Sequence, residues 1–88
     1  MRKEYSLTSL RDYPGQYKKF LERLRQARLE AGMTQTEVAN ALQKPQSFVS
    51  KCETGERRID VVELQVLANL YGVSLTYFVE GIGKEQHE

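Results

Sequence analysis

The chain has 88 residues, a single cysteine and a formal net charge of +1, a length that suits one small domain with a thin core and argues against an enzyme with a deep pocket. One cysteine excludes an intramolecular disulfide, and Cys52 with a lone His87 is too little for a zinc site. No apolar run is long enough to cross a membrane and no signal-peptide pattern is present, so we expect a cytoplasmic protein.

The spacing of apolar residues predicts an all-α protein with no strand. Residues 1–12 have no clear period, and we expect an extended or frayed N-terminal extension there. One domain is predicted over residues 13–82, followed by a polar C-terminal tail over residues 83–88. Within the domain, the predicted helices cover about residues 14–31, 35–42, 45–54, 61–71 and 75–79.

Prolines and glycines mark where these helices begin and end. Pro14 is tolerated only in a first turn, so it indicates the start of the first helix, and Pro45 indicates the start of the third. Four glycines follow periodic apolar segments, where a left-handed residue is expected to end a helix: Gly32, Gly55, Gly72 and Gly81. The apolar stripe of the first helix is predicted to comprise Tyr17, Phe20, Leu21, Leu24, Ala27 and Ala31.

Capping boxes predict the starts of two other helices. Thr34 with Glu37, and Asp60 with Glu63, each place a capping side chain three residues before a glutamate. Ser74 is expected to cap the last, short helix. An apolar residue before each cap should pack on one that follows it, in the pairs Met33 with Val38, Ile59 with Leu64, and Val73 with Phe78.

The third helix has one polar and one apolar side. At about 100° per residue, one side carries Gln46, Ser47, Ser50, Lys51 and Thr54, and the other carries Phe48, Val49 and Cys52. Amide, hydroxyl and ammonium groups can all bond to base edges. An ordinary solvated helix would show the same amphipathic pattern, so the pattern alone does not decide. The very short link before this helix, two residues (Gln43 and Lys44) or three with Pro45, favours a perpendicular helix-turn-helix.

These features together resemble the Cro/C1-type helix-turn-helix of phage repressors and their bacterial relatives. The resemblance is carried by the stretches Met33–Leu42 and Pro45–Gly55, continues through residues 57–60 and 67–74, and covers roughly residues 17–80. It rests on the joint spacing of Thr34, Gln35, Ala39, Gln46, Ser47, Val49, Ser50, Glu53 and Gly55. It implies a compact five-helix, lambda-repressor-like domain that binds double-stranded DNA with the third helix in the major groove.

The resemblance also implies roles for individual residues. Matching positions make Gln46, Ser47 and Lys51 base readers, with Ser50 as a further contact. Gln35 would hold a phosphate through its amide, assisted by the N-terminus of the second helix. Further phosphate contacts are expected from Lys44, Arg57 and Arg58. Arg28 and Glu53 are expected to form a structural pair, and Ala39 to be small because the second and third helices cross there.

Three positions depart from the family pattern. Gln43 stands where the turn usually has glycine, so the turn is either strained, at a cost of about 1 kcal/mol, or differently shaped. Lys44 replaces an apolar residue, and its stem is expected to cover the core while its ammonium reaches a phosphate. Cys52 replaces a larger apolar residue and is expected to be a buried small hydrophobe rather than a redox switch.

Phe48 has two interpretations. It packs against the second or fourth helix, which its position on the third helix favours, or it is exposed and meets a thymine methyl.

The resemblance implies a homodimer. One helix reads only about four or five base pairs, and family members pair on palindromic half-sites about 34 Å apart. The end of the domain carries Leu75, Tyr77, Phe78, Val79 and Ile82, which we expect both to close the core and to meet a second copy. Tyr77, Phe78 and Ile82 are assigned to the interface, with Tyr77 and Ile82 the better candidates. The N-terminal segment with Tyr5, Leu7, Leu10 and Tyr13 either docks on its own domain or swaps onto the partner.

Charge is unevenly distributed along the chain. Residues 1–58 hold 12 Lys/Arg and 7 Asp/Glu, a net charge of +5, whereas residues 59–88 hold 1 Lys and 5 Asp/Glu, a net charge of −4. A basic front and an acidic back fit a nucleic-acid binder with a separate contact surface, although chance asymmetry in a short chain gives the same numbers.

The sequence therefore predicts a DNA-binding transcriptional repressor and not an enzyme, since no catalytic constellation or phosphate-binding glycine loop is present. No cofactor, metal, membrane or small-molecule ligand is implied, and no aromatic platform for RNA is evident. The alternative is a protein-interaction or antitoxin-like module that keeps the fold with little or no DNA binding. Among DNA-binding roles, a stand-alone repressor, a restriction-modification controller and an antitoxin all stay open.

Overall fold

The computed structural model describes residues 14–82, and this part of the chain contains five helices and no strand. The helices are α1 (Pro14–Glu30), α2 (Gln35–Leu42), α3 (Gln46–Thr54), α4 (Val61–Tyr71) and α5 (Leu75–Val79). The predicted all-α, five-helix fold is confirmed. The expected N-terminal extension, including Tyr5, Leu7, Leu10 and Tyr13, and the expected tail over 83–88 lie outside the described residues.

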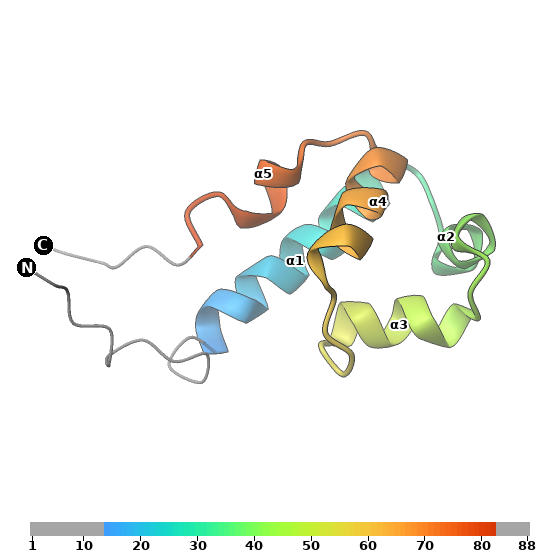
Figure 1. Ribbon diagram of the computed structural model, residues 1–88, viewed down its shortest axis with the longest axis horizontal. Coiled ribbons are helices and arrows are strands. Elements are labelled where there is room, and N and C mark those ends of the chain that lie inside the picture. Colours follow the sequence, from blue (N-terminus) through green and yellow to red (C-terminus); the bar gives the residue numbers. More distant parts are fainter. Residues whose placement is uncertain (1–13, 83–88) are drawn as a thin grey trace, which may run out of the picture.

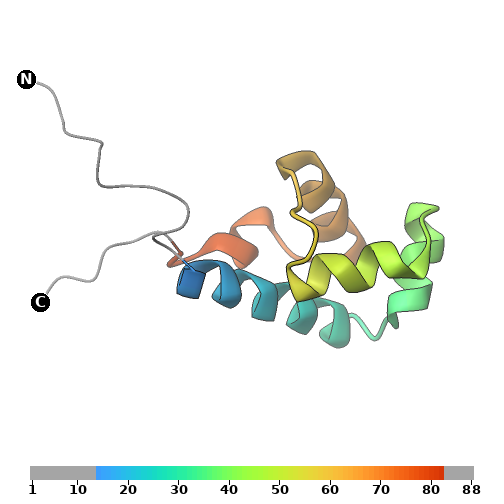
Figure 2. The same cartoon turned by 90° about the horizontal axis from the view of Figure 1, so that it is seen from below.

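Helix α1 organises the arrangement, because α3, α4 and α5 all contact it. A short turn joins α2 to α3, and the two helices cross steeply at one end of the molecule (Figure 1). Helix α5 turns back along α1 (Figure 1). Seen from below, α3 lies in front of the other helices with none of them over it (Figure 2). Across residues 14–82, no helix combines the length and the apolar character needed to span a bilayer.

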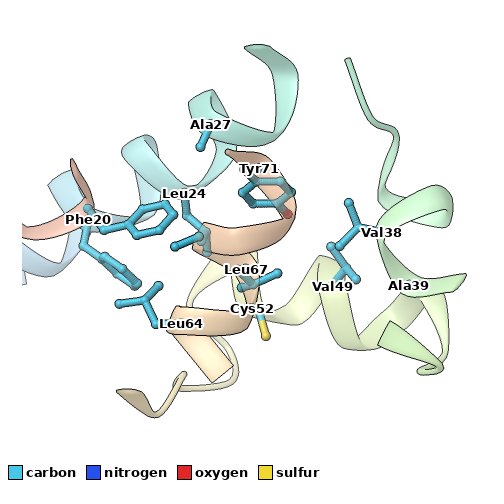
Figure 3. Close-up of a cluster of buried hydrophobic side chains, with 12 residues drawn as sticks. Phe20, Leu24, Ala27, Val38, Ala39, Val49, Cys52, Leu64, Leu67 and Tyr71 are labelled. Atoms are coloured by element: carbon cyan, nitrogen blue, oxygen red, sulfur yellow. The ribbon is translucent and has the colours of Figure 1, made fainter. Parts of the chain in front are cut away.

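One apolar core joins all five helices (Figure 3). Its most deeply buried large side chains are Leu24 of α1, Val38 of α2 and Phe78 of α5, each less than 2% exposed. Val38 and Val49 point toward each other where α2 meets α3 (Figure 3). Ala39 is 1% exposed beside them, which agrees with a small residue at the helix crossing. The predicted staple pairs each combine one buried and one half-buried apolar residue of this core.

Two predicted helix boundaries were wrong by one residue. Helix α1 ends at Glu30, and Ala31, predicted in its buried stripe, is exposed because Gly32 turns the chain at a φ of +74°. Helix α3 begins at Gln46 rather than Pro45, because the ψ of Pro45 is 154° and therefore extended. All four glycines predicted to end helices have a positive φ, as expected.

Both predicted capping boxes are present. Thr34 accepts a hydrogen bond from the backbone N–H of Glu37, whose carboxylate accepts one from the backbone N–H of Thr34. Asp60 and Glu63 make the same reciprocal pair at the start of α4. Ser74 occupies the capping position of α5 but bonds no backbone N–H there; its hydroxyl lies 2.9 Å from that of Thr76.

The turn between α2 and α3 has the backbone shape that a glycine would give. Gln43 has a φ of +59°, the only positive value at a non-glycine residue in the described chain. The backbone N–H of Lys44 donates to the carbonyl of Ala39 at 2.9 Å, and that of Gln43 donates to Asn40 at 3.2 Å. These bonds satisfy carbonyls that the end of α2 would otherwise leave open. The strained interpretation of this turn is therefore correct.

We predict that Gln43→Gly raises the free energy of unfolding by about 0.5 kcal/mol, because relief of left-handed strain exceeds the extra unfolded-state entropy of glycine. Urea unfolding followed by circular dichroism measures the change. Ala41→Gly, at an exposed position in the same helix, is the control and should lower stability by about 0.5–1 kcal/mol. A loss of stability in Gln43→Gly as large as the control's would contradict a strained turn.

Candidate nucleic-acid interface

The polar side of α3 faces solvent as the sequence predicted. Gln46, Ser47 and Lys51 are exposed and Ser50 is half-buried. On the opposite side, Val49 and Cys52 are each 3% exposed and belong to the core. The structure therefore brings all four predicted base readers onto one surface of one helix, which we call the reading face.

A buried ion pair fixes α3 against α1. Arg28 donates through Nε to Glu53 at 2.6 Å and through Nη2 at 3.0 Å, and both side chains are at least nine-tenths buried. A third bond, from Nη1 to the carbonyl of Met33 at 3.0 Å, extends the anchor to the segment before α2. The hydrogen bond that Arg28 donates to Glu53 raises the pKa of Arg28 above its ordinary value, and burial raises the pKa of nearby Tyr71 to about 12. The predicted structural pair is confirmed.

The same glutamate is linked through Gln35 to Gln46, the first of the predicted base readers. Gln35 donates from Nε2 to Glu53 at 3.0 Å, and its Oε1 accepts a bond from Nε2 of Gln46 at 2.6 Å. A relay thus runs from Arg28 through Glu53 and Gln35 to Gln46. Since an amide nitrogen carries two protons, Gln35 keeps one N–H for a further acceptor.

The start of α2 offers additional donors beside this amide. Helix geometry leaves the first backbone N–H groups without acceptors inside the helix, and the capping box uses those of Thr34 and Glu37. The N–H groups of Gln35 and Thr36 point out of the helix start, where an anion is also favoured by the helix dipole. This arrangement suits the predicted phosphate contact at Gln35.

Three predicted phosphate-binding cations differ in their partners. The guanidinium of Arg57 donates to both carboxylate oxygens of Glu63 at 2.9 Å, which lowers the pKa of that carboxyl. Arg58 lies over the ring of Tyr17, with 4.3 Å from its Cζ to the ring centre, and Lys44 lies over the ring of Phe48 at 5.3 Å. Neither Lys44 nor Arg58 makes an ion pair within the described residues. Of the three cations, Arg57 is thus the one that makes an ion pair within the described residues.

Phe48 packs inward, which decides between its two interpretations. Its half-buried ring lies against the core, with the Lys44 ammonium and the Arg57 guanidinium over it, the latter at 4.6 Å. This position lies on the side of α3 away from the reading face. Cys52 is buried and unpaired, as expected for a small hydrophobe, and burial raises the pKa of its thiol.

One residue assigned to the dimer interface needs correction. Phe78 has no exposed surface, because it sits in the core with its ring 6.3 Å from that of Phe20, and therefore it cannot contact a second copy. Tyr77 and Ile82 are half-buried and retain surface on the outside of the domain. Arg23, which no sequence pattern singled out, donates to the carbonyls of Tyr77 and Glu80 and fastens α5 to α1.

Comparison with known proteins identifies the family. A helix-turn-helix family model matches residues 24–78, well over half of the chain. The chain belongs to the Cro/C1-type helix-turn-helix family, a family of DNA-binding transcription regulators. It is also 34% identical over 64 residues to the HTH-type transcriptional regulator DdrOP3 of Deinococcus deserti, a match that covers 73% of this chain and 50% of that relative. The chain thus spans about half the length of this curated relative, and no solved structure matches it.

We predict that Glu53→Gln lowers the free energy of unfolding by about 3 kcal/mol, because it leaves the Arg28 charge buried without its partner. Urea denaturation at neutral pH measures this loss. Glu63→Gln is the matched control, since it breaks the solvent-exposed pair with Arg57 while glutamine keeps the capping box. Equal losses in the two variants would contradict a special role for the buried pair.

Proposed function

We propose that this protein is a sequence-specific regulator, a repressor, that binds double-stranded DNA with α3 in the major groove. The observation that supports this most directly is the relay from Arg28 to Gln46, which orients an exposed amide at the first turn of α3. Such an amide can pair with N6 and N7 of adenine. Ser47, Ser50 and Lys51 extend the same polar surface along the helix. A role on DNA also fits a cytoplasmic location.

The proposed contacts divide into base readers and phosphate contacts. Gln46, Ser47, Ser50 and Lys51 read bases, since their side chains share the reading face. Gln35 holds a phosphate with its spare N–H and the start of α2. Lys44, Arg57 and Arg58 contact flanking phosphates. The side chain of Arg57 is 41% exposed, so it can contact a phosphate although its guanidinium also bonds to Glu63.

We also propose that the protein binds a palindromic operator as a homodimer, with Tyr77 and Ile82 at the contact between copies. Next to them Val79 is 44% exposed, so this end of the domain presents apolar surface. A two-fold dimer would place two reading faces on successive turns of one side of the duplex, about 34 Å apart.

Removing the amide or the ammonium of the reading face should weaken specific binding. We expect Gln46→Ala to cost about 1–3 kcal/mol and to relax the preference at one base pair, and Lys51→Ala to reduce affinity for the operator as well. Fluorescence anisotropy on an operator selected from a random DNA pool measures both. Gln26→Ala, at an exposed position on α1, is the control and should bind like the parent protein. Wild-type binding by both reading-face variants would overturn the placement of this face.

Salt dependence separates this function from the alternative, a protein-interaction module with the same fold. Neutralising several phosphates gives a logarithm of the binding constant that falls steeply with the logarithm of salt concentration. A DNA-binding curve indifferent to salt would favour the interaction module.

The dimer has its own test. We expect Ile82→Glu to shift the protein toward monomer in sedimentation equilibrium and to weaken binding to a full palindrome more than to a half-site, because a buried unpaired carboxylate opposes association. Leu29→Glu introduces the same charge at a 47% exposed leucine on α1 and is the control. A dimer unaffected by Ile82→Glu would show that the copies meet elsewhere.

A further inference from the structure

A groove separates α3 from α4 on the side of α3 that faces away from the reading face. Its walls are almost wholly apolar and comprise Leu42, Phe48, Ile59, Val62, Val66 and Leu67. Cys52 also lines it, and Figure 3 shows this residue beside Leu67. The groove is partly open to solvent and holds about 150 Å³, a volume comparable to that of a closed apolar protein cavity that binds one benzene molecule.

The groove is open rather than filled by the protein's own side chains. Val62 is 69% exposed and Val66 is 45% exposed, although both are apolar and belong to its wall. Exposed apolar residues that line a concavity are typical of a binding site, whereas the same residues scattered singly over a surface need no explanation.

Charge at the groove favours a negative occupant. Its two polar wall residues are Lys44 and Glu63, and the Glu63 carboxylate is already bonded on both oxygens by Arg57. The charged residues that line the groove thus balance each other, and Arg57, which lies over the ring of Phe48 at 4.6 Å without lining the groove, adds one positive charge beside it. Lys44 is exposed, and within residues 14–82 its ammonium makes no ion pair and lies over the Phe48 ring. This ammonium is therefore available to an anionic group held above the apolar floor.

We infer that the groove between α3 and α4 binds a small apolar anion, one aromatic ring or branched aliphatic chain that carries a single carboxylate. The ring or chain lies among the apolar walls, and the carboxylate pairs with Lys44. A partner of this size matches the volume of the groove, and its carboxylate matches the exposed ammonium of Lys44.

Binding in this groove opposes binding to DNA, a consequence that rests on the proposed function. Lys44 would serve both the carboxylate and a DNA phosphate, and one ammonium cannot be fully engaged by both. By linkage, the anion weakens DNA binding by the same factor by which DNA weakens binding of the anion. The groove thus makes α3 a reading helix with an effector site on its reverse side.

Methyl NMR with three small probes tests the site independently of DNA. Phenylacetate should shift the methyl signals of Leu42, Ile59 and Val66 saturably, with a Kd on the order of 1 mM. Phenylacetamide, which has the same shape without the charge, should bind at least about threefold more weakly. Acetate, which has the charge without the ring, should leave these methyls unmoved.

Substitutions in the groove test whether phenylacetate binds there. Val66→Glu should abolish the phenylacetate shifts, whereas Leu29→Glu, with the same added charge at a similarly exposed site on α1, should retain them. Lys44→Gln should bring phenylacetate and phenylacetamide to equal affinity. Equal affinity for the two probes in the parent protein, or equal loss in Val66→Glu and Leu29→Glu, would overturn the site.

Two further outcomes separate the site from its rivals and from the proposed function. A dimer in sedimentation equilibrium that Val66→Glu dissociates would make the groove a contact between copies and overturn the inference. For the coupling, saturating phenylacetate should raise the DNA Kd of the parent protein about two- to tenfold but leave that of Lys44→Gln unchanged. If the protein binds no DNA, the proposed function fails while the NMR result still decides the site.

Discussion

The buried pair of Arg28 and Glu53 is the interaction on which the rest of this structure depends. Neither charge tolerates burial alone, since removing an ion from water costs several kcal/mol. Each is stabilised by the other through two hydrogen bonds, so α1 and α3 are held at one relative position. Glu53 also accepts a hydrogen bond from Gln35, so the position of Glu53 also affects the start of α2. Gln35 in turn accepts a hydrogen bond from Gln46.

An apolar pair in the same place could serve stability equally well. Replacing a buried ion pair by hydrophobic residues of similar volume is often neutral or stabilising. It would, however, remove the acceptor that orients Gln35, and Gln46 would lose its fixed partner. The carboxylate at Glu53 therefore contributes orientation that packing alone would not supply. The buried carboxylate thus lies where it can orient an exposed side chain through Gln35.

Local signals in the sequence predicted most of the fold. The features that they did not predict depend on contacts between residues far apart in the chain. Capping boxes at Thr34 and Asp60 predicted helix starts correctly, because each depends on residues only three apart. Two hydrogen bonds could not be predicted from the spacing of residues: the one from Gln35 to Glu53 and the one from Arg23 to the carbonyls of α5. In both, the groups meet only after the helices pack. Phe78 failed as an interface residue for a related reason. The sequence shows that a residue is apolar, but apolar residues occur both in the core and at dimer contacts. Only the packing of the folded chain shows which of the two a given residue joins.

The polar groups on the two sides of α3 differ in burial. Around Glu53 the charges are buried and bonded to each other, so Gln46, the one reading-face residue tied to them through Gln35, has a defined partner. Around Phe48 the charges of Arg57 and Lys44 rest on an aromatic ring at a half-exposed rim, where each bond contributes less and water competes for it. A rigid face suits discrimination between bases, because a mismatched base then leaves a fixed donor unpaired. The rim charges belong to Lys44 and Arg57, which flank α3 in the chain, and a second ligand at the groove can redirect them without disturbing the fold.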